Sequence, residues 1–330
     1  MSPADAGFLA EYAALTSGVG LVDCSDRTQI EITGDDRAPF LHNLTTAAIR
    51  SLQPGQGCEA FALDVRGHTL GHFLVFCTPH SLIIDSVAGQ NERLAAQFER
   101  YHIRERIEIH DRTDEWGELL LSDSKARAIL ESLMGTISDG AFPTEPLSHC
   151  QARLADHTVW LRNVEIAGSG GVLISAARES IAPVAEAILA AGAMRCSAAA
   201  LETARIEAGW PVFGIDISDK NLPQEVDRNA RAISFTKGCY LGQETIARID
   251  ALGHVNKTLC GVRFTGSEVP LPGVELRSGD AAVGTVTSAT FSPRLSAPLA
   301  LAYIRRGFNT PRTKLTSPSA EAEIISLPLT

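Results

Sequence analysis

The sequence predicts an α+β fold in which two mostly antiparallel α+β units are followed by a small domain of β-strands. Two observations support this prediction. Alternating apolar and polar residues indicate short strands, and apolar residues at helical spacing indicate the helices between them. The order of strands and helices also occurs twice in the first two thirds of the chain. This order fits sheets with helices on one face better than a doubly wound parallel sheet.

The first unit is predicted to span residues 1–113 and the second to span residues 114–252. The elements of the first are a strand at 28–34, a helix at 38–49, strands at 58–65, 69–77 and 81–87, a helix at 91–101 and a strand at 106–111. The elements of the second are a strand at 117–123, a helix at 125–134, strands at 150–155, 158–164 and 171–177, and helices at 179–191 and 198–209. The two halves share no visible sequence similarity, so the repeat is an expectation about topology only.

The sequence pattern changes from Thr258 onward, where short predicted strands are interrupted by glycine and proline. These strands are expected at 258–264, 274–278, 281–289, 299–304 and 321–327. Such a pattern is typical of a small barrel or sandwich. A third domain is therefore predicted at 253–330.

The composition is that of a globular chain, with 330 residues, 45% hydrophobic residues and a formal net charge of −10. This length suggests two or three domains. The negative charge argues against an extended nucleic-acid surface, although a local basic pocket for a small anion remains compatible with it. We therefore expect no nucleic-acid partner.

Seven cysteines are spread along the chain without a Cys-x-x-Cys pair. This favours a reducing compartment and no autonomous metal or cluster site. The N-terminal residues lack the pattern of a targeting peptide, and no stretch approaches the roughly 18 apolar residues of a membrane span. We therefore expect a cytoplasmic protein that does not enter a membrane.

The most informative stretch is the octapeptide from Lys237 to Glu244, Lys-Gly-Cys-Tyr-Leu-Gly-Gln-Glu. It places a lysine two residues from Cys239, between glycines and before a polar helix start. A neighbouring cation or a following helix N-terminus lowers the pKa of a thiol, which makes it nucleophilic or metal-binding. The alternative is that Cys239 is a small buried apolar residue, as most free cysteines are.

Glu207 lies in the last turn of the helix predicted at 198–209, where the helix dipole disfavours negative charge. One interpretation is a solvated surface glutamate. The other is an acceptor for a ligand such as a fused aminopyrimidinone ring, whose adjacent N–H groups one carboxylate can accept. The weakly structured segment 210–231 follows, and long loops of this kind tend to be functional. Its aromatic residues Trp210 and Phe213 either pack on a planar ligand or pin the loop to the core.

Taken together, four motifs resemble the signatures of the YgfZ-type folate-binding proteins, which are relatives of the glycine-cleavage T-protein, GcvT. The motifs are Arg-Ile-Glu-Ala-Gly-Trp-Pro at 205–211, Leu-Pro-Gln-Glu at 222–225, Ile-Ser-Phe-Thr followed by the octapeptide at 233–244, and Ala-Arg at 247–248. The resemblance covers essentially the full length of the chain, and the octapeptide is its most specific part.

The resemblance implies two α+β units that form a folate-binding domain around a central cavity, followed by a C-terminal β-barrel. It implies tetrahydrofolate or a one-carbon derivative as cofactor, and iron–sulfur assembly factors or their client enzymes as partners. By matching positions, Glu207 would hold the pterin ring, and Lys237 with Cys239 would be the functional pair. Arg205 would also bind the cofactor, and Gln243, Glu244 and Arg248 would line the same cavity or orient the octapeptide.

One departure from the T-protein pattern bears on activity. The aminomethyltransferases have an Asp-Asp pair in the strand after a matching glycine, whereas the residues after Gly67 are His-Thr-Leu-Gly-His at 68–72. The carboxylate expected to manage proton chemistry is therefore missing. The resemblance thus favours a folate-binding accessory protein, and whether it is an enzyme stays open. The alternatives are a folate-dependent aminomethyltransferase or other one-carbon transferase, and a scaffold that kept the fold without the ligand.

Overall fold

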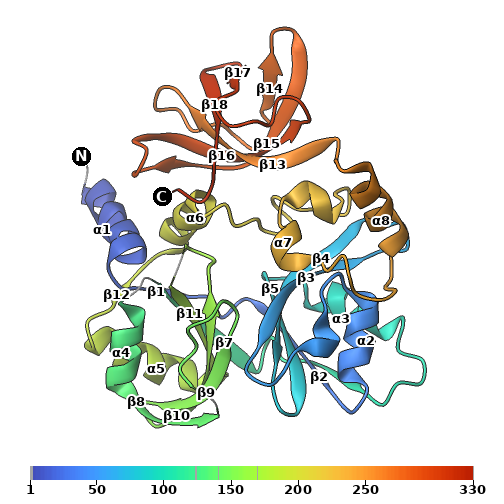
Figure 1. Ribbon diagram of the computed structural model, residues 1–330. Helices are drawn as coiled ribbons and strands as arrows, with labels where there is room; N and C mark the ends of the chain where they lie inside the picture. Colours follow the sequence, from blue (N-terminus) through green and yellow to red (C-terminus); the bar gives the residue numbers. More distant parts are fainter. Residues whose placement is uncertain (1–2, 123–124, 140, 169, 330) are drawn as a thin grey trace.

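The computed structural model describes residues 3–122, 125–139, 141–168 and 170–329. Residue 123, which the prediction included in the strand 117–123, lies outside the described residues, as do the ends of the predicted domain ranges at 1–2 and 330. Two α+β units lie side by side and a β-barrel sits above both (Figure 1). The expected α+β class with a C-terminal barrel is thereby confirmed.

The first unit is built on a five-stranded antiparallel sheet in the order β3-β4-β5-β2-β6. Its strands are β2 (Thr28–Thr33), β3 (Gly57–Leu63), β4 (Thr69–Cys77), β5 (Ser81–Ser86) and β6 (Glu108–Asp111). The helices α2 (Arg37–Leu44) and α3 (Asn91–Glu99) pack on one face of this sheet through Phe40, Leu41 and Phe98, and the short η1 (Ile49–Ser51) follows α2. The expected helix at 38–49 is thus two shorter pieces.

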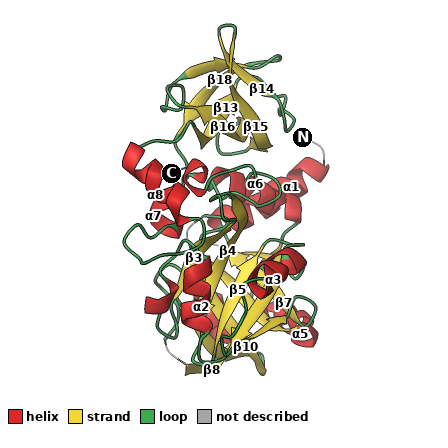
Figure 2. Cartoon of the chain, turned by 90° about the vertical axis from the view of Figure 1, so that its right-hand side faces the viewer, coloured by secondary structure: helices red, strands yellow, loops and turns green. Residues whose placement is uncertain are grey.

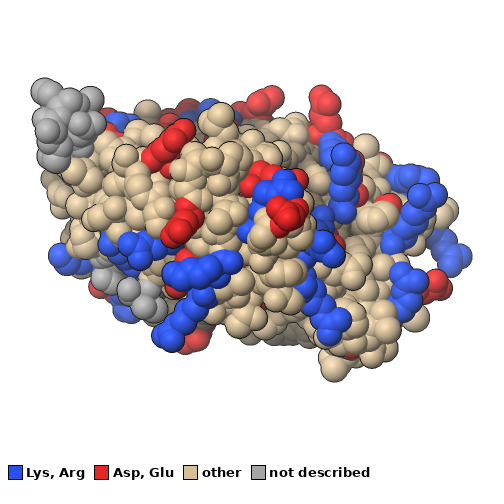
Figure 3. Space-filling model, turned by 90° about the horizontal axis from the view of Figure 1, so that it is seen from above, with Lys and Arg blue, Asp and Glu red and all other residues tan. Residues whose placement is uncertain are grey.

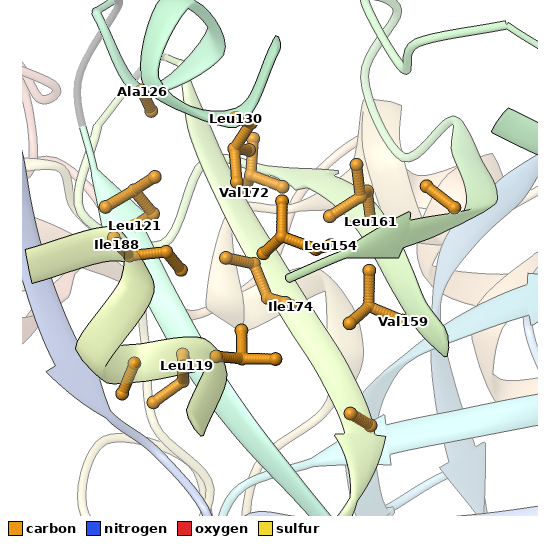
Figure 4. Packing of buried hydrophobic residues seen from close by; sticks show 14 of the residues in the cluster. Leu119, Leu121, Ala126, Leu130, Leu154, Val159, Leu161, Val172, Ile174 and Ile188 are labelled. Atoms are coloured by element: carbon orange, nitrogen blue, oxygen red, sulfur yellow. The ribbon is translucent and has the colours of Figure 1, made fainter. Parts of the chain in front are cut away.

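The second unit is a seven-stranded sheet in the order β12-β1-β7-β11-β10-β9-β8, antiparallel except between β1 and β12. Its strands are β1 (Gly20–Asp23), β7 (Trp116–Ser122), β8 (Met134–Asp139), β9 (His149–Leu154), β10 (His157–Val164), β11 (Gly171–Ala177) and β12 (Met194–Arg195). The helices α4 (Ala126–Leu133) and α5 (Arg178–Ala190) cover one face. Figure 4 shows Leu130 of α4 and Ile188 of α5 beside the strand residues Leu119, Leu121 and Ile174.

The other faces of the two sheets meet through a mixed core. Because side chains alternate between faces along a strand, Leu119 and Leu121 reach the helices while Glu118 and Leu120 point the other way. The guanidinium of the fully buried Arg162 donates to Glu118 (2.7 Å) and to Asp85 of the first unit (3.3 Å). Burying these charges is tolerated because each has an opposite partner.

The N-terminal segment differs from the prediction. The helix α1 (Pro3–Ser17) and the strand β1 were not expected, and β1 joins the sheet of the second unit although it falls in the range predicted for the first. A four-residue strand carries little periodic signal, and its pairing comes from β7, about a hundred residues away. The ranges 1–113, 114–252 and 253–330 stay predictions as domain boundaries.

Short helices connect the second sheet to the barrel and lie between the two α+β units and the barrel (Figures 1 and 2). They are α6 (Ala198–Glu207), η2 (Pro223–Val226), α7 (Asn229–Ala232) and α8 (Gln243–Leu252). The expected N-cap of α6 is confirmed, since the Ser197 hydroxyl accepts from the backbone N–H of Ala200. Gly209, with φ of +69°, follows the end of α6 in the left-handed conformation that favours glycine.

The C-terminal strands close into a barrel in the order β13-β16-β15-β14-β17-β18, so a sandwich is excluded. They are β13 (Lys257–Phe264), β14 (Glu275–Ser278), β15 (Ala281–Ser292), β16 (Ala297–Arg305), β17 (Lys314–Thr316) and β18 (Glu321–Ile325). Val262, Leu276 and Ile304 lie in its core. Seen from the barrel side, acidic and basic side chains are interspersed among other residues (Figure 3). Across the described residues, no helix has both the length and the apolar character needed to cross a membrane.

Candidate functional site

A cavity of about 930 Å³ lies where the two α+β units meet the barrel. The side chains around it come from distant parts of the chain: Thr16 from α1, Glu207 from α6, Arg231 from α7, Cys260 from β13 and Leu329 from the C-terminal segment. Its size is within the range of small-molecule and cofactor sites, about 300–1,000 Å³.

Glu207 lines this cavity and is only 4% exposed. Its carboxylate accepts hydrogen bonds from the hydroxyl groups of Tyr12 (2.7 Å) and Ser292 (2.5 Å). Burial and the bond to Glu207 raise the pKa of Tyr12 to about 12, so this phenol stays a donor at neutral pH. Each carboxylate oxygen has one such donor and keeps a further lone pair for a ligand. The surface-glutamate interpretation is therefore wrong.

Arg228 also lines the cavity, and a buried network holds it in place. Its Nε and Nη2 donate to the two carboxylate oxygens of Glu59, and its guanidinium lies 4.5 Å from the ring centroid of Trp210. His72 Nε2 lies 2.7 Å from Glu59 Oε1. Burial alone would raise the pKa of Glu59, but the bonds with His72 and Arg228 lower it to about 2. Glu59 is therefore ionised and unsuited to act as a base.

The two aromatic residues of segment 210–231 pin it to the protein. Trp210 belongs to the core between the sheets, and Phe213 is buried against Phe61 and Tyr240. The expectation that they either contact a ligand or fix the loop is thus resolved in favour of fixing, with Trp210 also supporting Arg228.

Lys237 is the first residue of the octapeptide, and its side chain reaches the C-terminal end of α2. Its Nζ donates to the carbonyl oxygens of His42 (2.5 Å), Thr45 (2.7 Å) and Ala47 (2.7 Å) and lies 4.7 Å from the ring centroid of Tyr240. Burial lowers the pKa of Lys237 to about 7, whereas three carbonyl oxygens favour the charged ammonium. All three N–H donors are used, so in this conformation Lys237 anchors the loop to α2.

Cys239 is exposed, which excludes the alternative that it is a buried structural residue. Of the other cysteines, Cys24, Cys77, Cys150 and Cys196 are buried, and Cys58 and Cys260 are partly buried. Neither Lys237 nor Cys239 belongs to the described residues that line the cavity of Glu207. The octapeptide therefore does not contribute to the lining of this cavity.

The other predicted ligand residues also lie outside the cavity lining. Arg205 is buried and donates to Glu202 and Asp216, while Asp216 accepts from Thr287 of β15, so Arg205 ties α6 to the barrel. Gln243 Oε1 accepts from the Tyr240 backbone N–H at the start of α8, whereas Glu244 and Arg248 are exposed on that helix. This arrangement fits the expectation that Gln243 orients the octapeptide.

Two partners of Glu207 and two residues of the cavity lining were not predicted from the sequence. Tyr12 lies on the unexpected helix α1, and Ser292 is the last residue of β15. Arg228 and Arg231 lie within the segment 210–231 that was considered functional, and their spacing of three residues was the available signal. Within the described ranges, no group of three or more His, Cys, Asp or Glu side chains is arranged to hold a metal ion.

Comparison with known proteins agrees with this architecture. The family described as "GCVT N-terminal domain" matches residues 2–237, and "Glycine cleavage T-protein C-terminal barrel domain" matches residues 257–329. A solved structure, the glycine cleavage system aminomethyltransferase T from Bartonella henselae, superposes with a TM-score of 0.87 at 18% identity, covering 97% of this chain and 89% of the other.

Two curated relatives are similar at low identity. A putative chloroplastic transferase of Arabidopsis thaliana is 28% identical over 297 residues, covering 89% of this chain and 67% of the relative. An aminomethyltransferase of Chlorobium chlorochromatii is 26% identical over 317 residues, covering 94% of this chain and 85% of the relative. The chain belongs to the GCVT family, with its N-terminal domain and its C-terminal barrel.

Proposed function

We propose that this protein is a tetrahydrofolate-binding accessory protein that supports assembly or repair of iron–sulfur clusters, with the Lys-Gly-Cys motif as its functional centre. The observation that best supports folate binding is the buried carboxylate of Glu207 in the wall of a cavity of about 930 Å³. The cluster role is supported by the similarity of the octapeptide to the YgfZ-type proteins, and the family membership agrees with folate as ligand.

The cavity suits a reduced folate on chemical grounds. The aminopyrimidinone ring of a pterin has adjacent N–H donors, and an ionised carboxylate accepts such a pair in bidentate fashion. Tyr12 and Ser292 hold the Glu207 carboxylate without using all of its lone pairs. Glu207 would therefore hold the ring, and the cavity volume leaves room for the remainder of the ligand.

The residues where the transferases have an Asp-Asp pair do not supply a catalytic carboxylate here. Gly71 has no side chain, and a Cβ there would lie 2.6 Å from the Leu94 side chain. His72 is buried against Glu59 and stacks on Phe61 with ring centroids 4.9 Å apart. Glu59 itself is 1% exposed and committed to Arg228. These contacts favour folate binding without the T-protein reaction.

The exposed thiol of Cys239 supports chemistry at a partner rather than inside the cavity. Iron–sulfur clusters usually take four ligands, whereas this motif supplies one, so a cluster would be completed by a partner protein or a second copy of the chain. Lys237 would act by holding the loop against α2 through its three carbonyl contacts.

A complementation experiment tests this function. Cells that lack the protein would receive the wild type, Cys239→Ser, or Cys196→Ser as a control for a buried thiol, and a cluster-dependent enzyme would be assayed. We expect Cys239→Ser to abolish rescue while its tetrahydrofolate affinity, measured by calorimetry, stays nearly unchanged. Full rescue by folded Cys239→Ser would remove Cys239 from the mechanism.

The second candidate is an aminomethyltransferase or another folate-dependent one-carbon transferase. It is favoured by the names of the curated relatives, two of which are an aminomethyltransferase and a putative transferase. Turnover of an aminomethylated lipoyl carrier by the purified protein would establish it. Folate binding without turnover would favour the accessory function.

A further inference from the structure

Two arginines near α7 line the same cavity as Glu207, and the pterin contacts proposed above use neither of them. Arg228 is the N-cap of α7 and Arg231 lies three residues later, a spacing that places side chains on one side of a helical turn. The protein carries a formal net charge of −10, so two cations on one cavity wall are a local departure from its overall charge. This wall is suited to an anionic group.

Arg228 is fixed on two sides before any ligand arrives. Its side chain is 11% exposed, because Glu59 occupies the Nε and Nη2 edge and Trp210 lies against the guanidinium face. Glu59 is in turn bound to His72, so the guanidinium has a buried chain of support. Such preorganisation reduces the side-chain entropy that ligand binding would otherwise cost.

One nitrogen of Arg228 remains available. Among the described residues, hydrogen bonds are recorded for Nε and Nη2, and the two N–H groups of Nη1 have no acceptor. Arg231 is exposed at the same wall, where it pairs with Glu165. Guanidinium groups bind carboxylates through planar sets of N–H donors, which an ammonium group cannot reproduce.

Two further acidic residues line the cavity near these arginines, Asp227 and Glu165. Arg228 lies beside Asp227, whose pKa burial raises and Arg228 lowers, and Arg231 pairs with Glu165, so each carboxyl group has a cation next to it. The cavity therefore has an acceptor, Glu207, on α6 and donors near α7. A ligand with N–H donors at one end and carboxylates at the other matches this distribution of charge.

We propose that Arg228 and Arg231 form a carboxylate-binding subsite that takes the glutamate end of the folate ligand. This inference rests on the proposed folate-binding function and deepens it by assigning the direction of the ligand: the pterin lies at Glu207 and the glutamate at α7. Glu59 and His72 are positioning residues, because they act on the ligand only through Arg228.

The test compares tetrahydrofolate with its diamide, in which both glutamate carboxylates are replaced by neutral carbamoyl groups of similar size. Calorimetry under reducing conditions gives both affinities for the full-length wild type, Arg228→Gln and Arg231→Gln. We expect Arg228→Gln to weaken tetrahydrofolate binding about 10- to 100-fold, the range for losing hydrogen bonds to a charged group, and to leave diamide binding nearly unchanged. Arg231→Gln should shift selectivity in the same direction by less, because it is more exposed.

Three further variants keep the test decisive. Arg228→Gln leaves the buried Glu59 without its ion-pair partner and could fail to fold, so the double variant Glu59→Gln/Arg228→Gln removes both charges. Glu59→Gln alone should lower the ratio of the two affinities through Arg228, whereas a merely structural defect would weaken both ligands equally. Arg294→Gln is the matched cation control, since Arg294 lines the cavity beside Tyr12. It should change both affinities by the same factor.

The outcomes distinguish failure of the carboxylate-binding subsite from failure of the proposed folate-binding function. Wild type that prefers tetrahydrofolate to the diamide, with the preference lost in Arg228→Gln or the double variant, supports the subsite. Equal losses for both ligands overturn the subsite while folate binding stands. Failure of the wild type to bind either ligand overturns the proposed function and the subsite together.

Discussion

Replacing Glu207 by glutamine exchanges one acceptor oxygen of the cavity for an amide donor and removes the negative charge, with little change in side-chain size. The carboxylate is 4% exposed and accepts from Tyr12 and Ser292 in the free protein. Glutamine can keep one of these bonds, so the fold should lose about 1–3 kcal/mol, the cost of one unsatisfied buried group. That loss is small enough for the variant to stay folded.

Glu207→Gln should weaken ligand binding more than most surface substitutions would. A pterin bound to Glu207 would make two hydrogen bonds to a charged acceptor, each contributing about 1.5–3 kcal/mol. Because such contributions are not additive, we expect a loss of about 3 kcal/mol, which corresponds to roughly 100-fold weaker tetrahydrofolate binding. Glutamine also presents an N–H group toward the donors of the ring, which adds a repulsive contact.

Calorimetric titration with tetrahydrofolate measures this loss, and circular dichroism shows whether the variant is folded. Glu202→Gln is the matched control, because it removes a carboxylate from the same helix at a position that does not line the cavity. We expect its affinity to equal that of the wild type. A folded Glu207→Gln protein that binds tetrahydrofolate as tightly as the wild type would refute the assignment of Glu207 as the pterin anchor.

Three further predictions concern the surroundings of the cavity and the octapeptide. The pKa of Glu59 is lowered to about 2, so its ionisation stabilises the fold above the unfolded pKa of about 4.5. As the pH falls from 4.5 to 2, the wild type should therefore lose about 3 kcal/mol more free energy of unfolding than Glu59→Gln, measured by denaturant titration. Equal losses in the two proteins would argue against the network of Glu59, His72 and Arg228. Native alkylation followed by mass spectrometry should modify Cys239 first, because it is exposed; faster labelling of a buried cysteine would contradict the loop conformation. Gly242→Ala should cost about 2 kcal/mol or more, since φ is +78° and a Cβ would lie 2.6 Å from the Asp64 carbonyl oxygen, whereas Gly238→Ala meets nothing within 4 Å and should cost less than about 1 kcal/mol in thermal melts; similar losses would contradict this geometry.

The fold was predictable where periodicity was strong. The long strands β4 and β11 carry clear patterns, and the barrel strands are separated by glycine and proline, so their order could be predicted from local signals. The helix α1 and the strands β1, β8, β12 and β17 were missed. Most of these strands are short, and their pairing depends on partners that the local sequence does not specify.

The candidate site was predictable only in part. Glu207 could be found because a charged residue at an unfavourable helix end lies within a recognisable motif. Arg205 belongs to the same motif, but whether it meets a ligand or Asp216 depends on the packing of the barrel against α6. Tyr12 and Ser292 approach Glu207 from positions 195 and 85 residues away in sequence, and no local pattern encodes that contact.

The position of the octapeptide outside the cavity lining likewise depends on contacts between residues that are distant in sequence. Sequence places Lys237 and Cys239 about thirty residues after Glu207 and cannot show that Lys237 is bound to the end of α2 in the first unit. In three dimensions the motif has an exposed thiol, an anchored ammonium group and a tight glycine turn at Gly242, apart from the cavity. The account therefore assigns ligand binding and thiol chemistry to different places on the molecule.

A crystal structure of the protein with bound tetrahydrofolate tests the central claim most directly. The account predicts the ligand in the cavity between α6, α7 and the barrel, with the pterin ring N–H groups within hydrogen-bonding distance of the Glu207 carboxylate, about 2.7–3.2 Å. A folate bound at the octapeptide beside Cys239, or in the cavity without contact to Glu207, would contradict it.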